Sequence, residues 1–107
     1  MHPFDNRFVR ELPGDPSTSP GSRQVFGACY SRVTPVQPSQ PQWLAVSSEV
    51  AAMLGIDAEA MQSESLLKAL SGHTLVPGME PFAMCYGGHQ FGHWAGQLGD
   101  GRAINLG

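Results

Sequence analysis

Residues 86–102 read YGGHQFGHWAGQLGDGR. These seventeen positions hold six glycines, two histidines and three aromatic residues. Because glycine costs extra backbone entropy on folding, its repeated use indicates positive φ angles or a close approach of the backbone to a neighbour. Backbone amides presented by such a turn can hold phosphate oxygens. The stretch is therefore the first candidate for a functional site.

Strands are predicted on both sides of this stretch. Residues 81–86 and 102–106 have the composition of strands, and the glycine run connects them. Asp100-Gly101 is a common turn dipeptide in hairpins. We therefore expect a β-hairpin over residues 79–107, with a second arm that has barely begun at Gly107. The chain is then the N-terminal piece of a longer protein.

The pattern upstream predicts two short helices. Residues 47–55 begin with a serine cap, carry the acid Glu49 in the first turn and end at Gly55, which predicts a short helix. Ser63 caps a second helix over Glu64–Leu70 in the same way. A short strand is expected within residues 25–33, so residues 25–78 hold one strand and the helices.

Residues 1–24 are predicted to form loop. The segment from 11 to 24 has almost no apolar side chains to offset the entropy of ordering, and its prolines block regular hydrogen bonding. The fold class expected from the whole pattern is α+β, with one domain in 107 residues.

Composition limits the possible partners. The net charge is −3, with six basic and nine acidic residues, so no field attracts a nucleic acid backbone. No apolar run approaches the ~18 residues of a membrane span, and the N-terminus has no secretory pattern. Two cysteines are too few for a disulfide scaffold and indicate a reducing compartment. The expected location is the cytoplasm, without membrane or nucleic acid partners.

A zinc site is one alternative function. Cys29, Cys85, His89 and His93 offer a Cys2His2 ligand set for a small zinc-stabilised interaction module. The separation of the two cysteines weakens this hypothesis, because structural zinc sites bring their ligands in close pairs. Cys85 has no basic neighbour in sequence to favour a thiolate, so it is interpreted as an inert buried thiol.

The glycines themselves allow two interpretations. Residues 96–101 have the spacing GxxGxG, which is neither the dinucleotide fingerprint nor the P-loop. Their amides, together with Arg102, can form a phosphate cradle, whereas spacing alone favours a bulged hairpin. Four aromatic residues of this region are expected in the core rather than in a stacking platform: Phe82, Tyr86, Phe91 and Trp94.

Residues 86–104 resemble the signature of the selenoprotein O family, called YdiU proteins in bacteria. Weaker similarity runs through residues 75–81, 28–33 and 4–6, so the resemblance covers nearly the whole chain. It implies the N-terminal part of a protein-kinase-like fold that is incomplete here. It also implies transfer of AMP, with UMP left open, from the nucleoside triphosphate to hydroxyl side chains of target proteins.

The resemblance assigns nucleotide-binding roles residue by residue. Gly99, Gly101 and Arg102 match the loop of the family that contacts the phosphates of ATP. No residue of the chain matches a catalytic position, and the ligands of Mg²⁺ or Mn²⁺ are expected beyond Gly107. The chain alone is therefore expected to be inactive. The target proteins, the metal preference and the redox control are not indicated.

Overall fold

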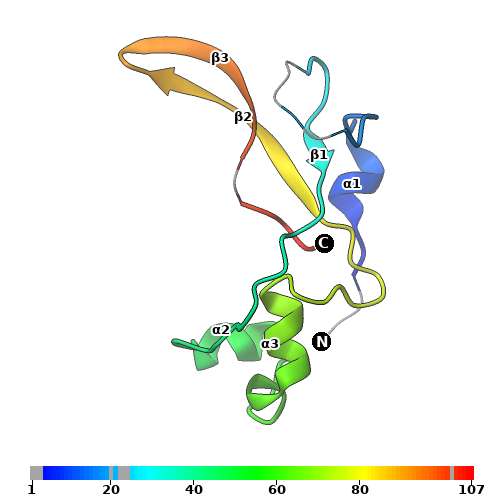
Figure 1. Ribbon diagram of the computed structural model, residues 1–107, viewed down its shortest axis with the longest axis vertical. Coiled ribbons are helices and arrows are strands. Elements are labelled where there is room, and N and C mark those ends of the chain that lie inside the picture. Colours follow the sequence, from blue (N-terminus) through cyan, green and yellow to red (C-terminus); the bar gives the residue numbers. More distant parts are fainter. Residues whose placement is uncertain (1–3, 20, 22–24, 102) are drawn as a thin grey trace. The chain divides into compact units, whose positions relative to one another are not determined.

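The computed structural model describes residues 4–19, 21, 25–101 and 103–107. Its contacts divide the chain into two compact units. The first, called here the helical unit, is Met1–Asp5 with Pro35–Met79, and the second, the sheet unit, is Asn6–Thr34 with Glu80–Gly107. Figure 1 labels the elements of both units.

The helical unit contains three short helices. They are α2 (Ser48–Met53), the 3-10 helix Ala60–Gln62 and α3 (Glu64–Leu70). Asp57 accepts the backbone N–H of Ala60 at 2.7 Å through its carboxylate, which begins the 3-10 turn. The two helices predicted from the sequence are confirmed, and the 3-10 helix lies between them.

Serine caps explain where α2 and α3 begin. The Ser47 hydroxyl accepts the N–H of Val50 at 3.3 Å, and the Ser63 hydroxyl accepts the N–H of Leu66 at 3.2 Å. Each bond satisfies one amide that a helix N-terminus leaves without an intrahelical partner. The helices pack around Ala51, Ile56 and Leu66, which are all buried.

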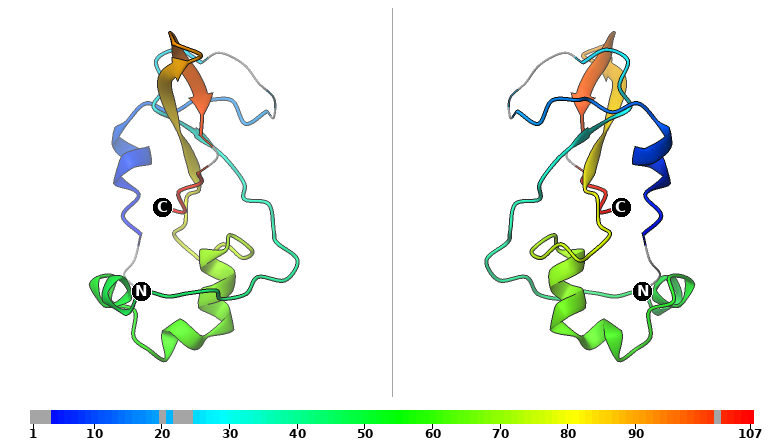
Figure 2. Two further views of the ribbon diagram at one scale, coloured as in Figure 1. Left: turned by 90° about the vertical axis from the view of Figure 1, so that its left-hand side faces the viewer. Right: turned by 90° about the vertical axis from the view of Figure 1, so that its right-hand side faces the viewer.

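The sheet unit contains a three-stranded antiparallel sheet in the order β1-β2-β3. The strands are β1 (Tyr30–Arg32), β2 (Phe82–Gln90) and β3 (His93–Asp100). Figure 2 shows β2 and β3 as one long twisted hairpin. The α+β class is confirmed, with one strand before the three helices of the helical unit and two strands after them.

A cluster of aromatic side chains forms the core of the sheet unit. Val9, Tyr30 and Phe82 are buried together, and Phe8 packs against them with its ring stacked on that of Phe82 at 5.0 Å between centroids. The Tyr30 hydroxyl donates a hydrogen bond of 2.7 Å to the carbonyl of Val9. Residues distant in sequence therefore form this core.

A helix within residues 1–24 differs from the predicted loop. α1 covers Arg7–Glu11, and its Val9 is buried. Five residues have too little local stability to form a helix alone, so the contacts of Phe8 and Val9 with Tyr30 and Phe82 supply it. The pattern of residues around α1 contains no information on these distant partners, so it could not predict the helix.

The hairpin turn also differs from the prediction. It lies at Phe91-Gly92, where φ is 50° and 80°, and not at Asp100-Gly101. Two positive φ angles in a two-residue loop match the right-handed twist of the flanking strands. The glycine run is consequently strand rather than loop, and the second arm of the hairpin is complete. No helix in the described ranges is long and apolar enough to span a bilayer.

Candidate functional site

The pairing of β2 with β3 is irregular in the half of the hairpin that leads to Asp100. The register shifts between Gly87 and His89 and again between Tyr86 and Gly87. The pairs His89↔Trp94, Gly87↔Gln97 and Tyr86↔Gly99 mean that β3 holds one extra residue at each shift. Such bulges bend and twist a strand and are frequent beside functional sites. Gly99 lies directly after the second bulge.

Two glycines are explained by this irregularity. At Gly87 an added Cβ would meet the carbonyl oxygen of Gly96 at 2.9 Å, closer than real Cβ atoms approach. Gly96 itself has a φ of 72°, in the region that glycine tolerates best. Both are therefore needed to build the first bulge, and they do not require a ligand to explain them.

The segment that follows β3, from Gly101 to Asn105, is held to β2 by backbone hydrogen bonds at both of its ends. The N–H of Gly101 donates to the carbonyl of Met84 at 3.0 Å, and Asn105 exchanges two backbone bonds with Phe82, at 2.8 and 2.9 Å. Gly101 and Asn105 are four residues apart, whereas their partners are two apart. Ile104, next to the second of these anchors, is 39% exposed.

Gly101 is not explained by the fold. Its φ is not positive, and an added Cβ would find its nearest neighbour, the Met84 carbonyl oxygen, at 3.8 Å, which is ordinary contact. Neither backbone strain nor packing demands glycine here. The structure of this chain alone therefore does not require glycine at position 101.

The predicted site residues have different outcomes. Gly99 pairs with Tyr86 in β3, and Gly101 follows the strand. Arg102 lies outside the described residues. The amide of Gly101 is committed to Met84, so this N–H is not a donor for phosphate in the structure. The nucleotide roles of the three residues remain predictions.

Sequence reasoning missed the residues that hold this loop. Met84 and Asn105 act through backbone groups, and the amide of the Asn105 side chain adds a bond of 3.5 Å to the Phe82 carbonyl. Backbone pairing leaves little trace in residue type. Asn105, a poor strand former within an apolar segment, was the one available signal.

The zinc ligand set is not brought together. Cys85 and His89 lie four residues apart in one strand, which separates their Cα atoms by about 13 Å. His89 instead contacts the ring of Trp94 edge to face, with 5.1 Å between centroids. Among the described residues there is no group of three or more His, Cys, Asp or Glu that could hold a metal. The structure therefore gives the zinc module no support.

The aromatic residues divide in a way that the sequence did not predict. Phe82 is buried in the core as expected. Tyr86, Phe91 and Trp94 are 49%, 100% and 65% exposed, so the prediction that they belong to the core was wrong. The two-stranded end of the hairpin extends beyond β1, and no layer covers it in the described part of the sheet unit.

One ion pair lies on the sheet unit away from the loop. The Arg32 guanidinium donates to the Glu80 carboxylate at 2.8 Å and lies 5.9 Å from the centre of the Tyr30 ring. The hydrogen bond to Glu80 raises the pKa of Arg32, with smaller contributions from the charges of Tyr30 and Glu80. This arginine stays charged, and it reinforces the pairing of β1 with β2.

The fold places the chain in the class of small α+β proteins that carry a glycine-rich β-hairpin. Comparison with known proteins gives the family. The family model described as protein adenylyltransferase SelO matches residues 19–107, and the chain belongs to this family.

Relatives support the same assignment. The chain is 62% identical over 107 residues to a protein nucleotidyltransferase YdiU of Methylobacillus flagellatus, which covers all of this chain and 21% of the relative. It is 63% identical over 104 residues to a protein of the same description from Aromatoleum aromaticum, covering 97% of this chain and 20% of the relative. The chain thus spans about a fifth of the length of these curated relatives.

Proposed function

We propose that this chain provides the nucleotide-binding part of a protein nucleotidyltransferase with a protein-kinase-like fold. The enzyme transfers AMP, or alternatively UMP, from the nucleoside triphosphate to hydroxyl side chains of target proteins in the cytoplasm. Family membership supports the class of reaction. The chain carries no assigned catalytic residue, so activity requires residues outside it.

The observation that carries the proposal is the unexplained glycine at position 101. It is itself fixed to β2 through its N–H, which donates to the Met84 carbonyl, and it directly follows a bulged strand. A residue without a side chain at the end of β3 lets a phosphate group come close to the backbone, while its own N–H stays bonded to Met84. Gly99, two residues earlier, and Arg102, directly after, complete the proposed contact.

The chemistry requires in-line attack on the α-phosphorus. The substrate hydroxyl loses its proton to a base outside this chain as its oxygen bonds to this phosphorus, the bond from phosphorus to the bridging oxygen breaks, and pyrophosphate leaves. Negative charge grows on the leaving group, and a guanidinium at Arg102 can stabilise it with charge-assisted hydrogen bonds. The loop of this chain holds the triphosphate in place, which is a positioning role.

A divalent metal, Mg²⁺ or Mn²⁺, is part of the same proposal, because it neutralises phosphate charge in such transfers. The described residues do not fit it: no cluster of three candidate ligands is present among them. We therefore assign no metal ligand to the described residues of this chain.

The first test substitutes Gly101→Ala in the full-length protein. Because an added Cβ has room, the thermal midpoint should stay unchanged, whereas nucleotide affinity should fall as the methyl group obstructs the ligand. Gly88→Ala is the matched control, since its Cβ would lie 3.5 Å from the Leu98 side chain, in ordinary contact. Equal nucleotide binding in the two variants would contradict the proposed site.

The second test removes the charge at Arg102. Arg102→Ala should weaken nucleotide binding or transfer by ~10-fold or more, the usual cost of losing a charge-assisted hydrogen bond. Arg7→Ala is the control, because Arg7 is exposed and forms its ion pair with Glu11, one helical turn away and in the helix α1. Unchanged activity in Arg102→Ala would remove this arginine from the site.

A further inference from the structure

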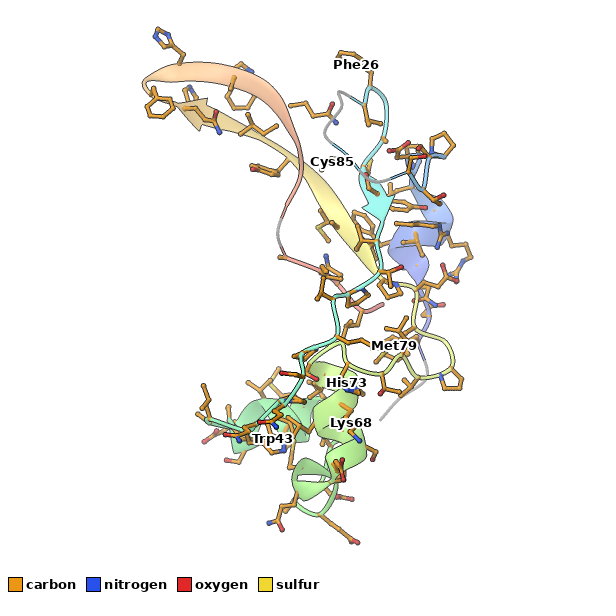
Figure 3. The ribbon with its side chains drawn as sticks, in the orientation of Figure 1. Phe26, Trp43, Lys68, His73, Met79 and Cys85 are labelled. Atoms are coloured by element: carbon orange, nitrogen blue, oxygen red, sulfur yellow. The ribbon has the colours of Figure 1, made fainter. Side chains whose placement is uncertain are left out.

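Cys29 and Cys85 face each other across the sheet, although 56 positions separate them in sequence. Tyr30 pairs with Met84 in the β1–β2 register, and the N–H of Cys85 donates to the carbonyl of Cys29 at 2.9 Å, one step further along. The two cysteines therefore lie opposite each other just before β1 begins, joined by this single backbone hydrogen bond, because the N–H of Cys29 donates to Pro13 instead. Figure 3 labels Cys85 on β2, beside β1.

We propose that Cys29 and Cys85 form a reversible cross-strand disulfide when the protein meets a peroxide. Directly opposed residues of antiparallel chains have Cα atoms about 4.5–5.5 Å apart, which lies within the range that disulfides span. The inference rests on the strand register and does not depend on the proposed function. The structure holds both residues as thiols.

The backbone fixes Cys29 from two sides. Its N–H donates to the carbonyl of Pro13 at 2.8 Å while its carbonyl accepts from Cys85. Its side chain also packs against the buried cluster of Val9, Tyr30 and Phe82. A thiol held this firmly opposite another meets its partner at high effective concentration, because the fold has already closed the intervening loop.

Both thiols are partly accessible, which oxidation requires. Cys29 and Cys85 are each intermediate in exposure. Cys85 is thus not the buried residue that the sequence predicted, and partial exposure of both residues gives a small oxidant a route to them. Intermediate exposure also allows a reductant to return the pair to thiols.

The reaction balances with hydrogen peroxide as the oxidant. One thiolate attacks a peroxide oxygen, the O–O bond breaks, and a sulfenic acid forms with release of hydroxide. The second thiol attacks the sulfenic sulfur, the S–S bond forms, and water leaves. Two sulfurs lose two electrons in total, and the peroxide is reduced to two waters.

Strand geometry makes the bond easy to reduce. Opposed Cβ atoms lie about 4.5–5.5 Å apart in a sheet, whereas a disulfide holds them at about 3.5–4.5 Å. Closure must therefore draw β1 and β2 together locally. Strained disulfides have higher reduction potentials and are the labile ones. The pair thus suits a reversible modification rather than a permanent structural link.

Peptide mapping of the full-length protein tests the proposal. Native protein is treated with hydrogen peroxide, alkylated and digested with trypsin, which releases residues 24–32 with Cys29 and residues 69–102 with Cys85. The two peptides should appear joined and should separate after dithiothreitol. Joining should be ~10-fold or more greater in folded than in urea-unfolded protein, because the fold closes the loop.

A shifted thiol gives the matched control. Ser31 pairs with Ala83, so Ser31→Cys combined with Cys29→Ser moves the β1 thiol two residues out of register with Cys85. Diagonal neighbours lie about 7–8 Å apart at Cα, beyond disulfide reach. The joined peptides should be lost in this variant and in Cys29→Ser alone.

Three results would overturn the inference. The first is peroxide-treated native protein in which both cysteines are recovered only as separate alkylated or sulfinic peptides. The second is equal joining in unfolded protein or in the shifted variant, which would show that register is irrelevant. The third is Cys29 or Cys85 joined only to other cysteines of the full-length protein.

Discussion

The internal contacts that stabilise the helical unit differ in kind from those that stabilise the sheet unit. In the helical unit the capping bonds join residues three apart, such as Ser63 to Leu66. In the sheet unit the defining bonds join distant residues: Tyr30 to Val9 across 21 positions and Arg32 to Glu80 across 48. The capping bonds of the helical unit therefore depend on residues close in sequence. The core of the sheet unit forms only when segments distant in sequence come into contact.

The residues of the candidate functional site also belong to only one of the two units. The loop that follows β3, its two backbone anchors and the opposed cysteines all lie in the sheet unit. The helical unit supplies an apolar cavity of about 720 Å³, lined in part by Trp43, Ile56 and Met61, and no group of metal ligands among its described residues. Long-range pairing thus builds the part of the chain that we expect to bind the nucleotide.

The largest expected effect is a loss of stability that is confined to the sheet unit. Phe82→Ala removes a side chain that is 3% exposed and contacts both Phe8 and Tyr30, so it should cost ~3–5 kcal/mol of stability. Native-state hydrogen exchange should show lost protection at β1 and β2 and retained protection at α3. Equal loss at α3 would mean that the units unfold together and that the comparison fails.

The same hairpin offers a control for this substitution. Phe91→Ala changes the same residue type at a position that is 100% exposed, so its effect should stay within about 0.5 kcal/mol. A large destabilisation by Phe91→Ala would show that the exposed end of the hairpin is covered in the protein.

A smaller effect tests the local character of the helical unit. Ser63→Ala removes the cap of α3 and should lower its stability by ~1 kcal/mol, because the amide of Leu66 loses its acceptor. The measurement is amide exchange within α3, with β2 unchanged. Ser65→Ala serves as the control, since the exposed Ser65 hydroxyl contacts only Ser63 at 3.4 Å.

The smallest effect concerns acid. The hydrogen bond from Lys68 and then its charge lower the pKa of Glu64 in α3. A carboxyl group with a lower pKa in the folded than in the unfolded state stabilises the fold above its unfolded pKa, and this contribution disappears as the pH falls through the folded pKa. Helical signal should therefore decline slightly below about pH 4. Glu64→Gln should flatten this part of the profile, and an unchanged profile would contradict the assignment.

Prediction from sequence succeeded where the signals were local. Ser47, Ser63 and Gly55 marked the helix ends because caps act on amides and carbonyls within one turn. The turn at Phe91-Gly92 was missed, because a phenylalanine with a φ of 50° is an uncommon turn residue. α1 was missed for a different reason: its stability comes from Tyr30 and Phe82.

For the candidate site, the sequence indicated which residues are involved but not how their backbone is arranged. The glycines of residues 86–102 marked an unusual backbone, and similarity to a family gave it a nucleotide-binding interpretation. Only the structure separates Gly87 and Gly96, which the bulge requires, from Gly101, which the fold leaves unexplained.

The sequence by itself determined the α+β class, the capped helices, the glycine-rich region and, through its similarity, the family. The tertiary structure decided the position of the hairpin turn, the formation of α1, the anchoring of the loop to Met84 and Phe82, and the opposition of Cys29 and Cys85. The physical reason is range. Propensity and capping act within a few residues, whereas strand register is set by backbone hydrogen bonds and core packing between segments that the sequence holds far apart.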